Sequence, residues 1–506
     1  MWQRFTFDDF RVICHYLGTL ILFMAAVMVL PLLTALAFQE WEPAARYVTS
    51  IGVALVVGML MRFMRVRPCH LGRRQALVVT GLAWIVLAVI ASFPLYFSGH
   101  YATYLDALFD GVSGLTTTGA SVLVDLDHLS NADNMFRFMM HLVGGLGLIV
   151  VALSLGLFGK RGGVSLYTSE ARSEQVVPSV VQTTRYIAGV TILCIGLATV
   201  LLTLFMLFSG MSPVRALLHA FWVSISGFVT GGFAPMSGSI MYYQSLPIEF
   251  ILMVLMILGS INFAMFAEVA RGRVGEFFRD IEVRTMFIWI AAMTVIFTAA
   301  LSQSSMFSDL PALLRRGMFM IVASFTTTGF QTITSNQLTT VLTSGAFISI
   351  ALLMAVGGGS GSTSGGIKFG RVGLIYKSIV STVKEALAPD SARVVVDYNH
   401  AGRHVLSPEI VKQAMTVFIL FVITYALGAM VGIAHGYDAT QAIFESVAMT
   451  SNGGLVTGMV SSGMPPTLEL FYIFQMWAGR LEFVTLLAVV VEAVVSLVPR
   501  RGAKNR

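Results

Sequence analysis

The segment Phe109-Asp-Gly-Val-Ser-Gly-Leu-Thr-Thr-Thr-Gly119 recurs in modified form at three later places in the chain. The other copies are Trp222-Val-Ser-Ile-Ser-Gly-Phe-Val-Thr-Gly-Gly232, Phe319-Met-Ile-Val-Ala-Ser-Phe-Thr-Thr-Thr-Gly329 and Phe444-Glu-Ser-Val-Ala-Met-Thr-Ser-Asn-Gly-Gly454. In every copy an aromatic residue precedes a glycine by ten positions, and an apolar residue follows that glycine. An internal repeat dictates the architecture, so these segments predict four copies of one structural unit.

Each copy lies between long apolar runs but is itself too short to cross a bilayer, which takes about 20 helical residues. We therefore predict a helix, a re-entrant loop and a second helix in each repeat. The expected re-entrant helices are Leu105 to Leu115, Val214 to Phe228, Leu310 to Phe325 and Thr440 to Thr450. Non-helical backbone is tolerated at membrane depth where it lines a water-filled cavity. We expect the glycine ends to meet around one pore as extended strands with inward carbonyls.

The composition indicates that lipid is the solvent of the chain. Of 506 residues, 56% are hydrophobic and only 11% are charged, which is too few charges to cover one large soluble domain. The predicted fold class is an all-α polytopic membrane protein, with two N-terminal helices and four helix, pore-loop, helix repeats around one pseudo-fourfold pore. The expected divisions are residues 1–70 for the two N-terminal transmembrane helices, then 71–165, 166–275, 276–390 and 391–506 for repeats 1 to 4.

The distribution of charge predicts the orientation. If both termini are cytoplasmic and ten helices cross, most of the 32 basic residues lie on inner segments, as the positive-inside bias requires. The net charge of +6 therefore needs no nucleic acid partner. The outer connections are acidic, which either concentrates cations at a vestibule or is only a solvated rim. The first apolar run is followed by more membrane and is not interpreted as a cleaved signal peptide. Cys14, Cys69 and Cys194 show neither disulfide nor metal spacing.

The glycine ends of the repeats have the chemistry of a cation filter. Glycine permits the backbone angles that a row of inward carbonyls needs. Four such strands can replace the hydration shell of a monovalent cation with backbone dipoles, although the choice of potassium over sodium does not follow from this argument. Small residues also pack helices together, but packing does not demand a constant spacing in four copies. The adjacent glycines in loops 2 and 4 leave the register open by one residue, and the constant spacing favours Gly232 and Gly454. The candidate filter residues are Thr117, Thr118, Gly119, Thr230, Gly231, Gly232, Thr327, Thr328, Gly329, Asn452, Gly453 and Gly454.

Two further features lie within expected transmembrane helices. Gly357 to Gly366 contains six glycines in ten positions, and each costs a helix about 1 kcal/mol relative to alanine, so we expect a break there. This break is either a mobile loop beneath the filter or a static kink. Arg480 lies in the last apolar run, where a cation costs at least ~2.5 kcal/mol unless it is paired or hydrated. It either faces the pore and repels ions, or it pairs with Glu482 or another buried acid, or it caps loop carbonyls. We favour the mobile loop and the pore-facing arginine.

These residues resemble the Trk/Ktr/HKT superfamily of potassium transporters over nearly the whole chain. Besides the four loops, Gly357-Gly-Gly-Ser-Gly-Ser-Thr-Ser-Gly-Gly-Ile-Lys368 is similar to the family's glycine-rich break in the third repeat. Ala478-Gly-Arg-Leu-Glu482 is similar to its signature in the last helix, and Phe278-Arg-Asp-Ile-Glu-Val-Arg284 precedes the third repeat. Two extra N-terminal helices look like the Trk type. The candidate gate residues are then Gly357, Gly358, Gly359, Gly361, Gly365, Gly366, Lys368 and Arg480.

The resemblance implies a function and partners. It implies potassium uptake across the cytoplasmic (inner) membrane by a multi-pass protein with both termini in the cytoplasm. Potassium would be held at the filter carbonyls, with no organic cofactor. The resemblance also implies a homodimer and a cytoplasmic, nucleotide-binding, TrkA-like regulatory subunit. We do not expect an enzyme, because the sequence has no nucleophile placed with a base, no HExxH and no GxxxxGK[ST] loop.

Two other transport functions remain open from the sequence. The potassium-binding subunit of an ATP-driven pump shares the fourfold plan, although the Gly-Arg-Leu-Glu ending and the broken third repeat favour the Trk type. A sodium- or proton-coupled cation transporter that works through carboxylates needs acids at mid-membrane, whereas Glu268 and Glu492 lie near helix ends. We interpret Asp106, Asp110 and Glu445 on the expected pore helices as vestibule or capping groups, and the histidines as interfacial or packing residues.

Overall fold

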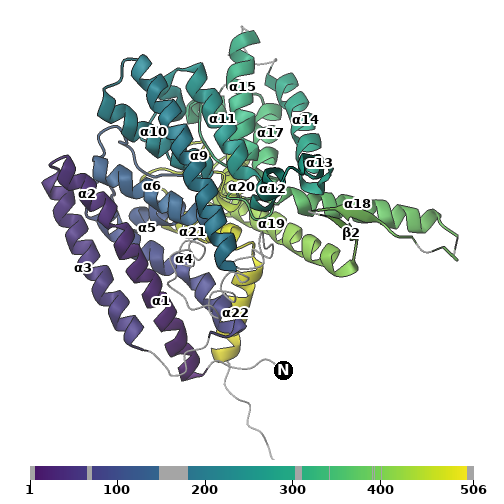
Figure 1. The fold of residues 1–506 in the computed structure, drawn as a ribbon, viewed down its shortest axis with the longest axis horizontal. Helices are drawn as coiled ribbons and strands as arrows, with labels where there is room; N and C mark the ends of the chain where they lie inside the picture. The colour runs from purple at the N-terminus through teal and green to yellow at the C-terminus, as the bar shows by residue number, and fades with distance from the viewer. Residues whose placement is uncertain are drawn as a thin grey trace, which may run out of the picture.

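The computed structural model describes residues 6–64, 71–147, 180–301, 310–340, 342–389, 391, 392, 394–400 and 402–497. Within these ranges the chain is a bundle of helices with one antiparallel hairpin, β1 (Asp397–Asn399) and β2 (Arg403–Val405) (Figure 1). The predicted all-α membrane fold is confirmed. Cys69 and the basic residues Lys160, Arg161 and Arg172, which the sequence assigned to inner segments, lie outside the described residues.

Three helices precede the first repeat and run along one flank of the bundle (Figure 1). They are α1 (Phe7–Val27), α2 (Val29–Ala37), which nearly continues α1, and α3 (Trp41–Phe63). Helices α1 and α3 cross where Gly18 meets Gly58, since a Cβ on Gly18 would lie 2.7 Å from the Gly58 carbonyl oxygen. Small residues allow this close approach in lipid. Arg46 of α3 binds Asp133 of the first repeat at 2.9 Å, which ties the N-terminal helices to the pore.

Each repeat contains a long rising helix, a shorter re-entrant helix and a descending helix. Repeat 1 has α4 (Arg73–Tyr96), α5 (Tyr104–Leu115) and α6 (Asn131–Leu146). Repeat 2 has α9 (Val180–Phe208), α10 (Pro213–Phe228), the short 3-10 helix η1 (Ser239–Tyr243), α11 (Leu246–Ser260), α12 (Phe263–Ala270) and α13 (Val274–Arg279). Repeat 3 has α14 (Ile281–Leu301), α15 (Leu310–Phe325), α16 (Ser335–Thr340), α17 (Ser344–Ala355) and α18 (Phe369–Leu387). Repeat 4 has α19 (Pro408–Ala434), α20 (Ala439–Thr450), α21 (Pro466–Arg480) and α22 (Val484–Leu497).

The re-entrant helices α5, α10, α15 and α20 begin within one residue of the predicted positions and end at the predicted residues. Local sequence explains where they start. Thr103 accepts a hydrogen bond from the Asp106 N–H at the start of α5, Asp438 caps α20, and Pro213 occupies the first turn of α10, where its missing N–H costs nothing.

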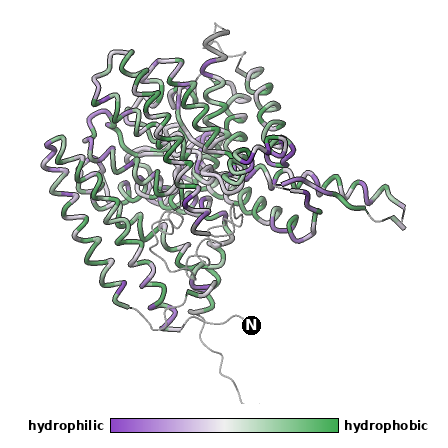
Figure 2. Tube along the Cα trace, viewed as in Figure 1, coloured by the Kyte–Doolittle hydropathy of each residue, from purple (hydrophilic) through white to green (hydrophobic). Residues whose placement is uncertain are grey.

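Six helices of the described residues are long and apolar enough to cross a membrane, and eight spans result if each of two bent pairs counts as one. The bends are 99° between α11 and α12 and 116° between α21 and α22. Figure 2 shows hydrophobic residues along the length of the bundle helices, with hydrophilic residues gathered around α13 and the hairpin. We call this side of the bundle the hairpin end and the opposite side the outer end.

Helix α18 and the hairpin project from the body of the bundle (Figure 1). Only Phe369, Gly370 and Gly373, in the first turns of α18, are buried. Further along, Ile379, Val383 and Leu387 follow one another at intervals of four residues and are 59%, 53% and 82% exposed. Helix α18 therefore presents an uncovered apolar stripe beyond the body of the molecule.

Candidate ion filter and intramembrane loop

The four glycine ends share one unusual backbone conformation. Positive φ angles occur at Gly119 (83°), Gly232 (87°), Gly329 (82°) and Gly454 (60°). The residue two positions earlier also has positive φ in every copy: Thr117 (56°), Thr230 (51°), Thr327 (53°) and Asn452 (53°). Non-glycine residues rarely adopt this conformation, so four occurrences at one repeat position are a built feature. The pattern puts Gly232 and Gly454 in register with Gly119 and Gly329, as the constant spacing favoured.

The four strands meet in a closed ring. A Cβ on Gly119 would lie 2.2 Å from the Gly231 carbonyl oxygen of repeat 2, and one on Gly232 would lie 2.2 Å from the Thr328 oxygen of repeat 3. A Cβ on Gly329 would lie 2.5 Å from the Gly453 oxygen of repeat 4, and one on Gly454 would lie 1.8 Å from the Thr118 oxygen of repeat 1. Each glycine therefore makes room for the carbonyl of the next repeat, in the order 1, 2, 3, 4 and back to 1. All twelve candidate filter residues belong to this ring or directly support it.

The position before the ring glycine differs between alternate repeats. In repeats 1 and 3 it is Thr118 or Thr328, whose hydroxyl lies 2.8 Å from that of Thr116 or Thr326. In repeats 2 and 4 it is a glycine, because a neighbouring helix fills the space behind the strand. A Cβ on Gly231 would lie 1.8 Å from His141 Nδ1, and one on Gly453 would lie 2.9 Å from Met354 Sδ. The adjacent glycines of loops 2 and 4 thus have a packing reason that the sequence did not reveal.

A second set of glycines supports the pore helices from behind. In each repeat a glycine near the end of the descending helix, or just after it in repeat 3, lies against the carbonyl of the last residue of its own pore helix. The hypothetical Cβ distances are 1.7 Å for Gly144 and Leu115, 1.8 Å for Gly259 and Phe228, 2.7 Å for Gly357 and Phe325, and 1.8 Å for Gly479 and Thr450. Sequence reasoning missed this role, although one glycine at or just after the end of each descending helix was a visible signal.

Two pore-helix acids hold the strands that leave the ring. Asp110 Oδ1 accepts from the Val122 N–H at 3.0 Å, and Glu445 Oε1 accepts from the Thr457 N–H at 2.7 Å. The two acids occupy the same repeat position, directly after the aromatic residue, and both are fully buried. They are capping groups, as one of the two predicted alternatives had it, rather than solvated vestibule charges.

The electrostatics of the ring favour a cation. All four pore helices end at the ring, so their C-terminal dipole ends, each equivalent to about half a negative charge, face it. The carbonyls of the ring add further partial negative charge. Among the described residues, the buried hydroxyl of Thr117 has no hydrogen-bond partner. The donor set consists of neutral oxygens, which suits a weakly hydrated monovalent ion.

The glycine-rich segment of repeat 3 is an ordered loop between α17 and α18, as the expected helix break requires. It closes on itself where the Gly357 N–H donates to Ile367 O at 3.1 Å and the Ile367 N–H donates to Ala355 O at 2.9 Å. Gly358, Gly361 and Gly366 have φ of 60°, 67° and 69°, which glycine adopts without strain.

The loop touches the filter directly. The Gly365 N–H donates to Thr327 Oγ1 at 2.7 Å, and the Thr363 hydroxyl lies 3.2 Å from that of Thr230. A Cβ on Gly365 would lie 2.0 Å from the Ser451 carbonyl oxygen, just before the fourth strand. The loop therefore contacts the pore-helix end of the filter in three of the four repeats.

Two cations lie beside the loop. Lys368 is buried, and its ammonium group donates to the carbonyls of Ser364 and Gly365. Arg480 donates to Thr363 O at 2.8 Å and to Gly144 O at 2.6 Å. Both side chains and Trp84 line a cavity of about 50 Å³, and the Arg480 guanidinium lies 5.6 Å from the centre of the Trp84 ring. All eight candidate gate residues thus lie in or against this loop.

Arg480 caps carbonyls, which is one of the alternatives considered for it, and the favoured pore-facing role stays a prediction. It joins the loop of repeat 3 to the end of α6 in repeat 1. The ion pair of Glu482 is with Arg371 of α18. Glu268 and Glu492, the acids weighed for a coupled transporter, are also paired, with Arg271 and Arg74 respectively.

Comparison with known proteins identifies relatives along almost the whole chain. The model of the TrkH family, described as a cation transport protein, matches residues 45–497. An uncharacterized cation transporter of Methanocaldococcus jannaschii is 30% identical over 96% of this chain and 96% of its own length. The Trk system potassium uptake protein TrkH of Escherichia coli is 29% identical over 94% of this chain and 98% of its own. The crystal structure of the potassium transporter TrkH from Vibrio parahaemolyticus superposes with a TM-score of 0.79 at 25% identity, covering 97% of this chain and 99% of that one.

Proposed function

Because the chain belongs to the TrkH family of cation transport proteins, we propose that it takes up potassium through the ring of four repeats. The observation that carries this proposal is the closed ring, in which each glycine makes room for a carbonyl of the next repeat. Its family transports cations and is not a family of enzymes.

The filter carbonyls are the proposed potassium ligands. The supporting geometry is the alternation of positive φ, which repeats in all four strands, together with the convergence of four helix C-termini. Thr117 adds a buried hydroxyl that has no hydrogen-bond partner among the described residues. Potassium is the cargo of this site, and the mechanism needs no organic cofactor.

The glycine-rich loop and Arg480 form the proposed gate. Ions leaving the filter toward the hairpin end meet the loop, which is bonded to filter residues of repeats 2 and 3. Arg480 joins the loop to repeat 1, because it donates to the Thr363 carbonyl of the loop and to the Gly144 carbonyl of α6. We call these hydrogen bonds the latch. Opening then requires the loop to leave the filter, which breaks these charge-assisted hydrogen bonds.

A chain of contacts links the gate to the hairpin. The Ser360 N–H of the loop donates to Glu282 at 3.1 and 3.2 Å, and the Glu282 N–H donates to Asp280 at 2.8 Å. Asp280 in turn lies 3.0 Å from His400 Nδ1 on the hairpin. A regulatory partner that moves the hairpin would therefore act on the loop through two buried carboxylates. We propose a nucleotide-binding, TrkA-like subunit in this role.

The hairpin end faces the cytoplasm in this proposal, within the inner membrane and with both termini cytoplasmic. The positive-inside bias supports this orientation, because Arg271, Arg273, Arg279 and Arg284 cluster at that end. We further propose a homodimer that covers the exposed stripe of Ile379, Val383 and Leu387 on α18.

The test is uptake of radioactive rubidium, a potassium substitute, into proteoliposomes that contain the purified protein. External potassium should inhibit rubidium uptake far more strongly than external sodium does. Protein-free vesicles serve as the control. Repeating the assay with and without a sodium or proton gradient separates passive from coupled transport. Absence of rubidium uptake by folded protein, together with sodium or proton flux, would refute potassium as the cargo.

A further inference from the structure

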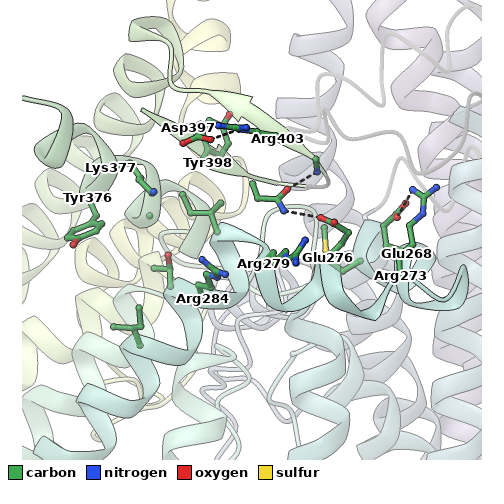
Figure 3. Close-up of a pocket in the computed structure, with 17 residues that line it drawn as sticks. Glu268, Arg273, Glu276, Arg279, Arg284, Tyr376, Lys377, Asp397, Tyr398 and Arg403 are labelled. Carbon is green, nitrogen blue, oxygen red and sulfur yellow. Dashed lines mark hydrogen bonds and ion pairs between the residues drawn. The ribbon is translucent and has the colours of Figure 1, made fainter. Parts of the chain in front are cut away.

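A cavity lined by several charged side chains lies outside the pore. Its volume is about 780 Å³, within the usual range for ligand pockets, and it lies between α13, α14, α18 and the hairpin (Figure 3). It is separate from the ring and the loop, and no step of ion permeation uses it.

The cavity has an excess of positive charge. Five cations line it, namely Arg273, Arg279, Arg284, Lys377 and Arg403, against three carboxylates, Glu268, Glu276 and Asp397. The three carboxylates have partners of their own. Glu268 binds Arg273 at 3.3 Å, and Glu276 accepts from the Asn399 side chain at 2.9 Å. Asp397 is paired with Arg403, whose hydrogen bond lowers the pKa of that carboxyl, so this acid stays ionised and engaged.

Three cations remain for a ligand. Among the described residues, no carboxylate lies within salt-bridge distance of Arg279, Arg284 or Lys377. Arg284 donates its Nε to the Phe278 carbonyl at 3.1 Å, which fixes the direction of its guanidinium. The cavity brings these side chains together from three different helices, α13, α14 and α18 (Figure 3). A phosphate group is the anion that arginine and lysine together recognise best.

Apolar side chains line the cavity beside these cations. Ile281 and Ile288 of α14 line it, and they are separated by roughly 10 Å along the helix axis at 1.5 Å per residue. Ile288 and Tyr376 are 71% and 65% exposed. A ligand that fills the cavity would therefore meet both cations and exposed apolar side chains, and Arg284 and Ile288 lie about one turn apart on the same face of α14.

We propose that this cavity binds the phosphate headgroup of an anionic phospholipid from the leaflet at the hairpin end, with its acyl chain along Ile288. Basic pockets between membrane helices are a recurrent way to hold such headgroups. The positive-inside bias alone explains basic residues at this end, but it does not explain their enclosure with apolar side chains. The proposal uses the proposed function only to name that leaflet as the cytoplasmic one.

The test measures lipid binding by native mass spectrometry of the full chain in detergent, with phosphatidylglycerol and phosphatidylcholine as probes. We expect preferential retention of phosphatidylglycerol. The double variant Arg279→Gln/Lys377→Gln should weaken its binding on the order of tenfold or more. Lys384→Gln is the matched control for the Lys377 change, because it removes one lysine charge two turns further along α18 and outside the cavity, and its binding should stay within about twofold of wild type.

The contrary outcomes are distinct. Equal retention of the two lipids, or unchanged phosphatidylglycerol binding in the double variant, would overturn the proposal. Displacement of the lipid by millimolar inorganic phosphate would make this a site for a free anion, and displacement by an acidic peptide would make it a protein-docking surface. No ion flux is measured, so failure here leaves potassium uptake untouched. Circular dichroism and size-exclusion chromatography of each variant confirm that it is folded.

Discussion

Replacing Gly119 with alanine tests whether the ring sets ion selectivity. The added Cβ would lie 2.2 Å from the Gly231 carbonyl oxygen, whereas Cβ contacts below 3.0 Å essentially never occur. The carbonyl of the neighbouring repeat must therefore move by about 0.8 Å. The φ of 83° at this position adds roughly 1–2 kcal/mol of backbone strain for a residue with a side chain.

A control variant separates the effect of the backbone strain from the effect of the displaced carbonyl. Gly436 has nearly the same φ, 87°, but a Cβ there would meet nothing within 4 Å. Gly436→Ala should therefore lose a similar amount of stability and keep its filter. Gly119→Ala should also lose selectivity. A change of about 1.4 kcal/mol in the difference between the potassium and sodium binding energies alters the ratio of the two binding constants tenfold.

The assay is rubidium uptake into proteoliposomes in competition with sodium, normalised to folded protein. We expect the potassium-over-sodium preference of Gly119→Ala to fall by at least tenfold, or its uptake to disappear, with Gly436→Ala close to wild type. If Gly119→Ala kept both its uptake rate and its preference, the ring would not be the selective element. An equal loss in both variants would attribute the effect to general destabilisation.

Three further predictions address the gate and the support of the filter. Arg480→Ala should raise basal flux several-fold, because it removes the hydrogen bonds that join the loop to α6. Arg480→Lys should stay nearer wild type. Lower flux in both variants, at normal protein yield, would contradict this role of Arg480. Gly231→Ala should abolish selective uptake, because its Cβ would lie 1.8 Å from His141 Nδ1. Adding His141→Ala removes this clash and should restore part of the uptake. No recovery in the double variant would mean that the clash with His141 is not the cause of the loss. Asp110→Asn should lower stability by about 1–3 kcal/mol, because one of the two carboxylate oxygens that accept from the Val122 N–H and the Ser121 hydroxyl becomes an NH2 group, which cannot accept. Thermal inactivation in detergent measures this loss, and an unchanged melting temperature would mean that the acid does not hold this strand.

The sequence alone determined the architecture and the equivalence of the four glycine ends. Hydrophobic run lengths decide which segments can span lipid, and a repeat with constant spacing decides that four segments are equivalent. Both signals are local, so they can be read without coordinates. For the same reason the pore helices, the break at Gly357 to Gly366 and the alignment of Gly232 and Gly454 with Gly119 and Gly329 were predicted correctly. The assignment of these glycines to an ion filter stays a prediction.

Tertiary structure decided what fills the space between the repeats. The reason why Gly231 is a glycine lies in His141, on another repeat, and Arg480 finds its hydrogen-bond acceptors in repeats 1 and 3. Glu482, two residues from Arg480, pairs instead with Arg371 on α18. Partners far apart in the sequence are chosen by packing, and in a low-dielectric interior a buried charge takes whichever carbonyls or carboxylates the fold brings near it. No spacing along the chain encodes that choice.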